Sequence, residues 1–561
     1  MRATDQHNQV SVKAYAGTTG VLLAMNIAPE RRDDLLGFAI HREGGNRPAQ
    51  WLNGMMTFPG IEHEPGQPLS TEQAPIQKFR WSDYRVYPDT TYKYEIHPVH
   101  GTPESPHVED GPTVEVRTES VRRGEHRVVF NRAAAASQAF SREFPNVDEE
   151  LEKAKEEGRP QELPSEALAW LSRGLLEQIT GFTTRAADPT WALDVAIYEY
   201  ELPAIMDSVK AALDRGADVR IVFHAASGDT QTEENEKNLA GWPPERLRPR
   251  VTSSIFHDKF AVLSRVRAGK RDPVSVLCGS TNWTRSGVYL QANVVHIAES
   301  EELARRYLNL FELLFGGATV AETRQWIDAN DPLPDDVPVV AGFSPRSGEK
   351  DLDVFVATID EAQSDVLFCT AFELDDRIDQ ALLGAAHDDV LRIGLQNRPS
   401  VITGYHRDRT ADFVATAYLK EGLEGFLAEK TRQPSGILIH TKLVVVNFTS
   451  DAPIVISGSH NLSAAASGQN DENYLVIRGD TNVADCYGVE LMRLYDHYRY
   501  RWLLDPDNTD PRPNDPCGPR PPNTLCPDNR WTTNYFNEGT LEAADRERFG
   551  IPLSSSSSPA S

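Results

Sequence analysis

The chain has 561 residues, 40% of them hydrophobic and 25% charged, and its formal net charge is −26. This length exceeds what one hydrophobic core organises, so we expect three or four domains, and no apolar run approaches the about 18 residues of a membrane helix. The negative charge disfavours general binding of nucleic acids, although it leaves room for a locally basic cleft.

Residues 9–118 predict an all-β region. Short apolar or alternating runs are separated by turn residues, as at 91–97, where Tyr92, Tyr94 and Ile96 fall on one face. Several short strands at this spacing indicate a β-sandwich. The segment FRWSDYRVYPDTTYKYEI resembles the later strands of a fibronectin type III or immunoglobulin-like domain. That resemblance implies a domain that binds or positions something.

From residue 165 the pattern changes to alternating strands and helices. An acidic run at 147–162 precedes the change and predicts a solvated helix face or a linker. Residues 193–225 read as strand, helix and strand, which predicts a βαβ unit with parallel strands. Residues 364–396 repeat this order. An internal repeat of this size indicates two similar lobes in one chain.

Each repeat is followed by the same two short motifs. A His-x-Lys pair opens an apolar strand, so both side chains point to one face, and a Gly-Ser-x-Asn turn follows the next strand. Either motif alone is usually a surface pair or a turn, but their joint repetition in the same order indicates a functional site. The first copy comprises His257, Lys259, Gly279, Ser280 and Asn282, and the second comprises His440, Lys442, Gly458, Ser459 and Asn461.

The paired motifs resemble those of the phospholipase D superfamily, over residues 165–500. The resemblance implies two α/β lobes packed face to face, one active site between them, and cleavage of a phosphodiester without a metal ion. The chain departs from the family where an aspartate usually stands five residues after the motif lysine, because it has Ser264 and Asn447 there. A further family position, an acid beyond the motif glycine, holds Glu472 in the second lobe and Asn293 in the first.

The expected fold is multidomain, with an N-terminal all-β sandwich followed by two pseudo-symmetric α/β phospholipase D-like lobes. We expect the fibronectin type III/immunoglobulin-like sandwich at residues 1–120, the first lobe at 121–340 and the second lobe at 341–505. Residues 506–561 predict a proline-rich, partly disordered C-terminal tail. Within this tail the segment YFNEGTLEAADRERFG predicts a short docking helix.

The motif residues supply what phosphodiester cleavage needs, namely neutralised oxygens, a nucleophile and a proton for the leaving oxygen. Lys259 and Lys442 provide charge, and Asn282 and Asn461 provide N–H donors. The motif serines add hydroxyl donors or brace the motif, and the motif glycines allow a tight turn beside the substrate. Histidine titrates near pH ~6.5, so a neutral imidazole can attack phosphorus while a protonated one donates to the leaving alcohol and later activates water. An alcohol in place of water would give headgroup exchange.

The single acid at the further family position distinguishes the two histidines. A carboxylate partner fixes the tautomer of an imidazole and raises its basicity. In the family, the acid of one lobe contacts the histidine of the other, which would pair Glu472 with His257. The expected roles are therefore His257 as nucleophile and His440 as general acid. If the pairing lies within one lobe, the roles reverse.

Three functions fit these residues. The first is phospholipase D-type hydrolysis of a phosphodiester, with a phospholipid headgroup as the preferred substrate, and the second is a metal-independent nuclease of the same superfamily. The third is a non-catalytic scaffold, but a degenerate lobe would have lost a His or a Lys, and neither lobe has. We expect no metal site and no cofactor. Nucleic acid stays open as a partner because arginines surround the first motif, although a solvated loop explains them better: Arg246, Arg248, Arg250, Arg265, Arg267 and Arg271.

The five cysteines are scattered and lack metal-ligand spacing, which indicates free thiols and a reducing compartment. Cys517 and Cys526 flank part of the proline-rich tail and could pair, yet two free thiols are the simpler interpretation. The N-terminus carries no apolar stretch of the signal-peptide type. We therefore expect a cytoplasmic protein.

Overall fold

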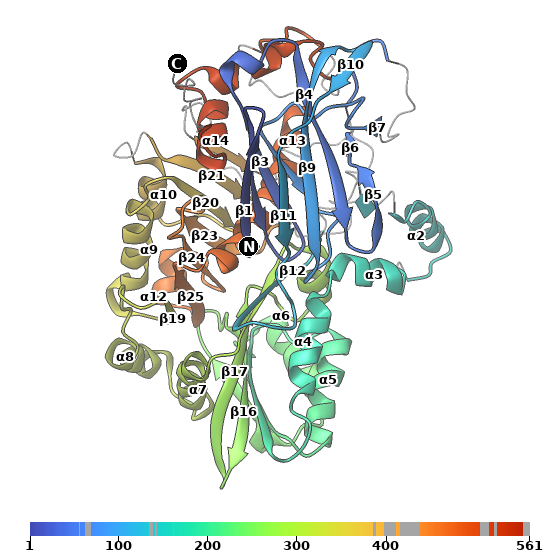
Figure 1. Cartoon of the computed structure of the whole chain (residues 1–561). Coiled ribbons are helices and arrows are strands. Elements are labelled where there is room, and N and C mark those ends of the chain that lie inside the picture. Colours follow the sequence, from blue (N-terminus) through green and yellow to red (C-terminus); the bar gives the residue numbers. More distant parts are fainter. Residues whose placement is uncertain are drawn as a thin grey trace.

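The structure of the chain is a computed structural model, shown in Figure 1. In that view the N-terminal strands lie at the top, the first α/β lobe lies below them in green, and the second lies at the left in olive to orange. The structure describes residues 1–54, 56–61, 69–133, 139–140, 143–160, 162–384, 389–397, 411–415, 438–504, 515–520 and 524–553.

The N-terminal region is all-β, as predicted. Tyr92, Tyr94 and Ile96 of one long strand are buried and alternate with less buried residues, which is the expected pattern for a strand with one face on a core. Both sheets of the region contribute to a shared apolar core. One sheet has the order β1 (Arg2–His7), β2 (Val10–Ala16), β3 (Val21–Ile27) and β8 (Arg80–Asp83). The other has the order β10 (Ser105–Val108), β9 (Thr91–Thr102), β4 (Leu35–Gly44) and β5 (Arg47–Trp51), with β11 (Thr113–Arg117) also on β9 and a small pair of β6 (Asn53–Gly54) and β7 (Leu69–Ser70).

Two seven-stranded sheets follow, and their strand orders are the same. The first has the order β12 (His126–Phe130), β18 (Val294–Ala298), β17 (Lys270–Gly279), β16 (Lys259–Arg267), β13 (Trp191–Ile197), β14 (Asp218–Ala225) and β15 (Leu247–Val251). The second has the order β19 (Val339–Ser344), β25 (Glu472–Arg478), β24 (Ile454–Gly458), β23 (Lys442–Val446), β20 (Asp365–Thr370), β21 (Leu391–Gln396) and β22 (Ala411–Ala415). Each strand thus has a counterpart, which agrees with the predicted internal repeat.

The helices complete the repeat. In each lobe the first two parallel strands, β13–β14 and β20–β21, are joined through a helix, α5 or α10, as the βαβ prediction requires. The helices before and within the first lobe are α2 (Val147–Glu156), which forms in the acidic run, α3 (Ser165–Ser172), α4 (Leu175–Thr184), α5 (Pro203–Asp214), α6 (Thr230–Asn238), α7 (Glu301–Phe315) and α8 (Val320–Asn330). Those that follow are α9 (Lys350–Asp360), α10 (Asp376–Leu383), α12 (Ala464–Gly468), α13 (Thr481–Leu504) and α14 (Leu541–Phe549).

The helices α7 and α13 connect the two lobes. Each follows the equivalent strand, β18 or β25, and each contributes to the apolar core that the lobes share. Tyr307 of α7 donates its hydroxyl to Asn473 Oδ1 of the second lobe at 3.2 Å. Tyr487 of α13 lies with its hydroxyl 2.9 Å from His296 Nδ1 of the first lobe. The lobes are therefore packed face to face, with polar contacts inside the interface.

The N-terminal region packs directly on the second lobe. Arg2 forms an ion pair at 2.8 Å with Asp485 of α13, whose carboxylate is fully buried. The ring of Tyr15 stacks on that of Phe448 with 5.1 Å between centroids. Buried charge pairs and ring contacts of this kind fix one orientation of neighbouring parts. The all-β region is therefore a fixed part of the body.

The described parts of the C-terminal segment, 515–520 and 524–553, are more ordered than the prediction of a proline-rich tail implied, and the predicted disorder of the serine-rich end lies outside the described residues. Cys517 and Cys526 form a disulfide, so the interpretation of two free thiols is wrong. The physical reason is that the segment folds back over the N-terminal strands, where Cys526 is fully buried and Trp531 Nε1 donates to Leu35 O at 2.9 Å. Cysteine usage therefore gives no support for a reducing compartment. The predicted docking helix is α14, whose Phe549 is fully buried.

In the part of the chain that the structure describes, no helix is both long and apolar enough to cross a membrane.

Candidate active site

Backbone contacts between the lobes bring the two His-x-Lys motifs together. The backbone N–H of His257 donates to Asp471 O at 2.9 Å, and that of His440 donates to Ala292 O at 2.9 Å. Asp471 directly precedes β25, and Ala292 lies just before β18, so each motif pairs with the other lobe at equivalent places. The two lobes therefore form the site through two equivalent backbone contacts, in which each motif histidine pairs with the residues just before a strand of the other lobe.

The imidazoles face each other across the interface. The ring centroids of His257 and His440 lie 6.1 Å apart, and each histidine is only 5% exposed. Lys259 Nζ donates to His257 O at 2.6 Å, and Lys442 Nζ donates to His440 O at 2.8 Å. This arrangement puts two imidazoles and two ammonium groups around one small space, as the shared-site prediction requires.

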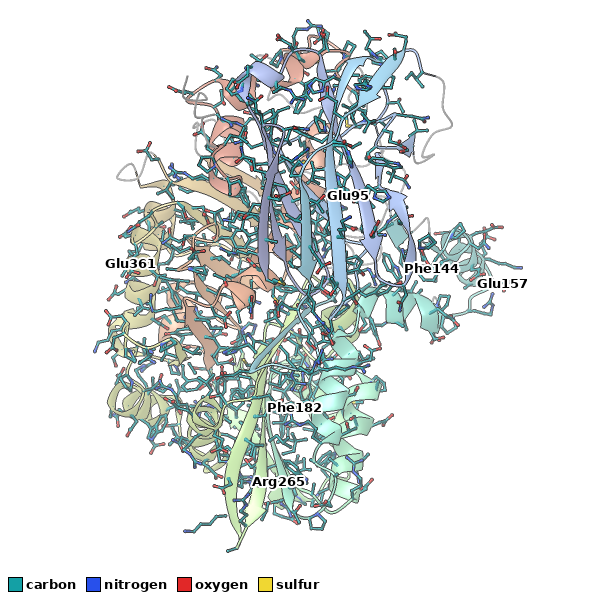
Figure 2. All side chains as sticks on the ribbon, viewed as in Figure 1. Glu95, Phe144, Glu157, Phe182, Arg265 and Glu361 are labelled. Carbon is teal, nitrogen blue, oxygen red and sulfur yellow. A yellow bond between two sulfur atoms is a disulfide. The ribbon has the colours of Figure 1, made fainter. Side chains whose placement is uncertain are left out.

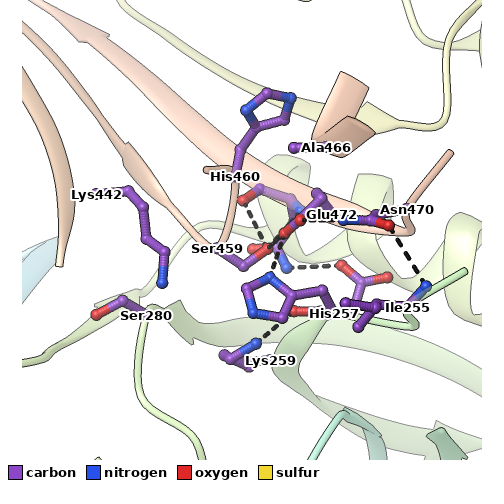
Figure 3. Close-up of polar contacts among 12 residues, drawn as sticks. Ile255, His257, Lys259, Ser280, Lys442, Ser459, His460, Ala466, Asn470 and Glu472 are labelled. Carbon is purple, nitrogen blue, oxygen red and sulfur yellow. Dashed lines mark hydrogen bonds and ion pairs between the residues drawn. The ribbon is translucent and has the colours of Figure 1, made fainter. Parts of the chain in front are cut away.

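The acid at the further family position pairs across the lobes. His257 Nδ1 donates to Glu472 Oε2 at 2.7 Å, as predicted for the interlobe pairing (Figure 3). At the equivalent place His440 Nδ1 donates to Asn293 Oδ1 at 3.0 Å. The two histidines thus have the same geometry but different partners, one a carboxylate and the other a neutral amide.

The motif serines brace these partners. Ser459 Oγ donates to Glu472 Oε2 at 2.7 Å, and Ser280 Oγ donates to Asn293 Oδ1 at 2.8 Å. Both serines are fully buried. Of the two roles expected for them, the structure displays the brace, because the hydroxyl hydrogens are directed at the groups that orient the histidines.

The motif glycines are required by close strand packing. A Cβ atom on Gly279 would lie 2.3 Å from Val294 O, and one on Gly458 would lie 2.2 Å from Asn473 O. Gly279 also has a φ of 143°, in the region that favours glycine. The glycines therefore allow the neighbouring strand to approach the motif, and a substituted side chain would displace the histidine partners.

The motif asparagines have unused hydrogen-bonding capacity. Among the described residues, Oδ1 of Asn282 and Oδ1 of Asn461 are both buried atoms without a hydrogen-bond partner. Asn282 contacts Glu199, a residue that the motifs did not indicate. The fold brings Glu199 near the motifs, since it closely follows β13, the strand that pairs with the one opened by Lys259.

Burial and charge set the protonation of the histidine pairs. Burial lowers the pKa of His257 to about 4, against the attraction of Glu472. Burial raises the pKa of Glu472, but the interaction with His257 and the charge of Lys259 hold it below its ordinary value. At neutral pH the pair is therefore a carboxylate and a neutral imidazole. The hydrogen on Nδ1 points at Glu472, and the lone pair on Nε2 is left for a substrate.

The second histidine is also neutral in the free site. Burial, followed by the charges of Lys442 and Lys259, lowers the pKa of His440 well below its ordinary value. Lys442 Nζ lies 3.1 Å from His440 Nε2, which accepts from it. The expectation of one neutral and one protonated imidazole near neutral pH therefore fails for the substrate-free site, because burial disfavours the imidazolium ion and the nearby lysine charges repel it.

The arginines near the first motif do not form a free phosphate-binding surface. Arg250 is buried and donates to both carboxylate oxygens of Asp471, at 2.9 and 2.7 Å. Arg271 pairs with Asp194, and Arg265 lies over the ring of Trp191. Figure 2 labels Arg265 on the hairpin of β16 and β17, far down from the second lobe. At ~3.3 Å per residue it stands about 20 Å along β16 from the motif lysine.

Removal of the buried Arg250 is expected to destabilise the protein strongly. Arg250→Ala leaves Asp471 as an uncompensated buried charge, which costs about 3–5 kcal/mol of unfolding free energy. Arg248 is the matched control, because it is exposed on the same strand and donates only to Phe315 O. Its replacement by alanine should cost about 0.5 kcal/mol. Urea unfolding of both variants measures the difference, and equal losses would contradict a role for the pair in joining the lobes.

The two residues that depart from the family pattern, Ser264 and Asn447, have structural roles in the lobes. Asn447 Oδ1 accepts from the backbone N–H groups of Gln363 at 2.7 Å and Ser364 at 3.1 Å, so it ties the end of β23 to the start of β20. Ser264 is fully buried in β16. Neither residue contacts a motif histidine through any hydrogen bond of the described residues.

One group of described residues has the spacing of metal ligands. His41, Glu43 and Glu95 lie on neighbouring strands of the N-terminal region, where Lys93 Nζ is 2.5 Å from Glu95 and already neutralises part of its charge. Within the described ranges no comparable group occurs at the paired motifs. The cationic groups of the site are the lysines themselves.

Comparisons with known proteins agree with this architecture. Residues 188–315 and 355–494 match the sequence model of the family described as "Cardiolipin synthase, PLD-like domain". These two segments fall in the first and second lobes, so each lobe contains sequence similar to the PLD-like domain. No protein with a curated description matches the chain.

The solved structures that align with this chain are distant. Polyphosphate kinase from Porphyromonas gingivalis aligns with 12% identity and a TM-score of 0.39 over 54% of this chain, and over 46% of its own length. Phosphatidylserine synthase from Haemophilus influenzae Rd KW20 aligns with 14% identity and a TM-score of 0.39, over 58% of this chain and 84% of that one. Nuc, a phospholipase D family member from Salmonella typhimurium, aligns with 23% identity and a TM-score of 0.20, over 24% and 82%.

Proposed function

We propose that the protein is a phospholipase D-type phosphodiesterase that works through a phosphohistidine. The observation that carries the proposal is the interlobe pair of His257 and Glu472, with His440 facing it at 6.1 Å between ring centroids. A neutral imidazole oriented by a carboxylate is the arrangement of an activated nucleophile. The two motif lysines supply the positive charge that an attacked phosphodiester needs.

The first step forms the covalent intermediate. His257 Nε2 attacks phosphorus, and the bond from phosphorus to the leaving oxygen breaks. His440 Nε2 gives the leaving oxygen a proton, and Lys442, which lies 3.1 Å from this nitrogen, can supply that proton to the imidazole. We call Lys259, Lys442, Asn282 and Asn461 the phosphate cradle, because these side chains stabilise the charge on the non-bridging oxygens.

The second step releases the phosphoryl group. Water loses a proton to His440, its oxygen attacks phosphorus, and the bond from phosphorus to His257 Nε2 breaks. The ion pair with Glu472 stabilises the cationic phosphohistidine in between. An alcohol that enters in place of water would accept the phosphoryl group, and this outcome is transfer.

A phospholipid is the preferred substrate class. Two large apolar side chains are exposed beside the histidines: Phe372 is 43% exposed with its ring centroid 6.3 Å from that of His440, and Ile255 is 39% exposed two residues before His257. An apolar rim suits acyl chains, whereas single-stranded nucleic acid calls for a basic groove with stacking aromatics. The net charge of −26 also disfavours a nucleic acid substrate, and so do the ion pairs that Arg250 and Arg271 form within the protein.

Transfer to an alcohol is the second candidate activity. The matched family model is described as cardiolipin synthase, which names an enzyme that makes a lipid. Both histidines are 5% exposed, so the covalent intermediate would be formed in a site with restricted access to bulk water. These observations favour an alcohol acceptor over water when a suitable alcohol is bound.

The N-terminal all-β region is proposed to be a fibronectin type III/immunoglobulin-like domain that belongs to the enzyme body. Its two sheets share one core, and Arg2 and Tyr15 attach it to the second lobe. The proposed role is to support the second lobe, because this attachment leaves no freedom to position a separate partner.

A substrate screen in the presence of EDTA tests the proposed function. The purified protein is expected to cleave phosphatidylcholine and bis(p-nitrophenyl) phosphate and to leave single- and double-stranded DNA largely intact. Added glycerol should yield a transferred product if an alcohol competes with water. DNA as the preferred substrate would favour the nuclease, and no cleavage of any substrate would favour the scaffold.

Cleavage is also expected to be independent of metal ions, because the lysines already carry the charge that a metal would supply. Activity in EDTA should therefore equal activity without it, measured as the initial rate on bis(p-nitrophenyl) phosphate. Abolition by the chelator, with rescue by one specific divalent ion, would contradict the phosphohistidine mechanism. Lys442→Ala is a useful companion variant, since the loss of an ammonium from the phosphate cradle should slow cleavage in EDTA and in its absence alike.

A further inference from the structure

An acid that the mechanism does not use lies against the phosphate cradle. Glu199 stands two residues beyond Ile197, the β13 residue that faces Lys259 across the sheet. The side-chain amide of Asn282 and the positive charges of Lys259 and Lys442 all favour the charged form of Glu199. Three of the four groups that would hold a phosphate therefore already interact with an internal carboxyl group.

The backbone that carries Glu199 is fixed on both sides. The fully buried Asn235 donates to Tyr198 O at 2.9 Å and accepts from Tyr200 N at 3.0 Å. The backbone N–H of Trp283 donates to Glu199 O at 3.2 Å. Because Trp283 directly follows the cradle asparagine, the acid and the cradle are held as one unit. Buried contacts thus hold the backbone of Glu199 next to the phosphate cradle.

The equivalent position in the second lobe shows that the fold itself does not require an acid. Cys369 faces Leu443, so the next residue, Thr370, stands opposite Lys442. In the first lobe Ile197 stands opposite Lys259 in the same way. Two residues beyond Thr370 is Phe372, the counterpart of Glu199. An aromatic residue serves in this place without loss of the local structure. The acid in the first lobe is therefore an addition to the common framework.

Titratable groups on three elements surround Glu199. Tyr198 and Glu201 stand on its own loop, Lys259 on β16 and Lys442 on β23. Burial raises the pKa of Glu199 to about 7, against the attraction of Lys259, and the charge of Glu201 raises it as well. Below this pH the carboxyl group is neutral, and an entering anion meets only the ammonium groups. Above it the carboxylate is charged, pairs with the lysines and repels the anion.

Building on the proposed function, we propose that Glu199 couples the binding of a phosphodiester to the uptake of one proton. As the anionic diester enters the phosphate cradle, Glu199 takes a proton from the solvent and donates it as a hydrogen bond to a non-bridging oxygen. No covalent bond to phosphorus is involved. Glu199 is therefore a substrate-binding residue whose charge decides how well an anion is accepted.

The pH dependence of KM tests this coupling with bis(p-nitrophenyl) phosphate, a diester that stays monoanionic. For the unaltered protein KM should rise above about pH 7, by up to about tenfold per pH unit, since one linked proton gives this limiting slope. Glu199→Gln keeps an uncharged hydrogen-bonding group of the same size. Its KM should stay constant from about pH 6 to 7.5 and be about tenfold lower than that of the unaltered protein at pH 8, with kcat changed much less. A rise that remains above about pH 8 belongs to Lys259, whose pKa burial lowers to about 8.

Glu201→Gln is the matched control. It removes a neighbouring negative charge but keeps the acid at position 199, so the rise of KM should move to lower pH without disappearing. This shift also tests the coupling if the Glu199 variant does not fold. The same pH profile in all three proteins would overturn the inference alone, and no cleavage by the unaltered protein would overturn both the inference and the proposed function.

Discussion

Replacement of His257 by alanine is expected to abolish the covalent phosphoryl-enzyme and to lower kcat by about 10⁴-fold or more, as for other enzymes that lose a nucleophile. The structural reason is the asymmetry between the histidine partners. His257 Nδ1 donates to the carboxylate of Glu472 at 2.7 Å, whereas His440 Nδ1 donates to the neutral amide of Asn293 at 3.0 Å. Only His257 has an anionic partner that stabilises the cation formed when its Nε2 bonds to phosphorus.

His440→Ala is expected to behave differently. The variant lacks the proton donor, but p-nitrophenol leaves without much assistance, so bis(p-nitrophenyl) phosphate should still form the covalent intermediate. The intermediate should then persist, because the base for water is also missing. A burst of p-nitrophenol followed by slow turnover would show this behaviour in a rapid kinetic experiment.

Mass spectrometry after a quench that preserves acid-labile phosphohistidine identifies the attacked residue. In His440→Ala the adduct should lie on a peptide that contains His257, and His257→Ala should give none. An adduct on His440 in the unaltered protein would reverse the assignment. Such an adduct would mean that some feature other than the carboxylate partner decides which histidine attacks phosphorus, since the two imidazoles have similar geometry.

The sequence predicted the parts of this site that follow from repetition. Two copies of one motif in one order require two similar lobes, and the structure has two sheets with the same strand order. The pairing of Glu472 with His257 was expected from the resemblance to the phospholipase D superfamily, in which the acid of one lobe contacts the histidine of the other. The repeat could be predicted because its information lies in spacing along the chain, which a sequence displays directly.

Features that depend on burial were not visible in the sequence. The neutral state of His440 results from the summed effect of desolvation and two lysines, one of them from the other lobe. The disulfide between Cys517 and Cys526 forms because the tail returns to the N-terminal strands, which proline-rich composition did not indicate. Glu199 carries no motif signal, and only the fold shows that it contacts the cradle. The sequence did not show whether the serine hydroxyls face the substrate or brace the histidine partners, because the fold determines their hydrogen-bond partners.

The carboxylate at position 472 is expected to account for most of the difference between the two histidines. Glu472→Gln keeps the size of the side chain but removes the charge, and its amide can turn an N–H toward His257. The imidazole then loses its orienting acceptor and the stabilisation of its cation, so kcat should fall by about 10²–10⁴-fold. Ser459→Ala is the matched control, because it removes the other hydrogen bond to Glu472 Oε2 and leaves the histidine contact in place. Its kcat should fall by about tenfold or less.

Exchange of the two partner residues extends this test. The double variant Glu472→Asn with Asn293→Glu moves the carboxylate to the place where Asn293 Oδ1 now lies 3.0 Å from His440 Nδ1. If the carboxylate selects the nucleophile, the adduct should move to the peptide that contains His440, and kcat should exceed that of Glu472→Asn alone. Thermal unfolding of both variants checks that each is folded. An adduct that stays on His257 in the double variant would show that the choice of nucleophile depends on surroundings that the two lobes do not share. The clearest such difference is that Glu199 lies beside the first motif, whereas Phe372 lies beside the second.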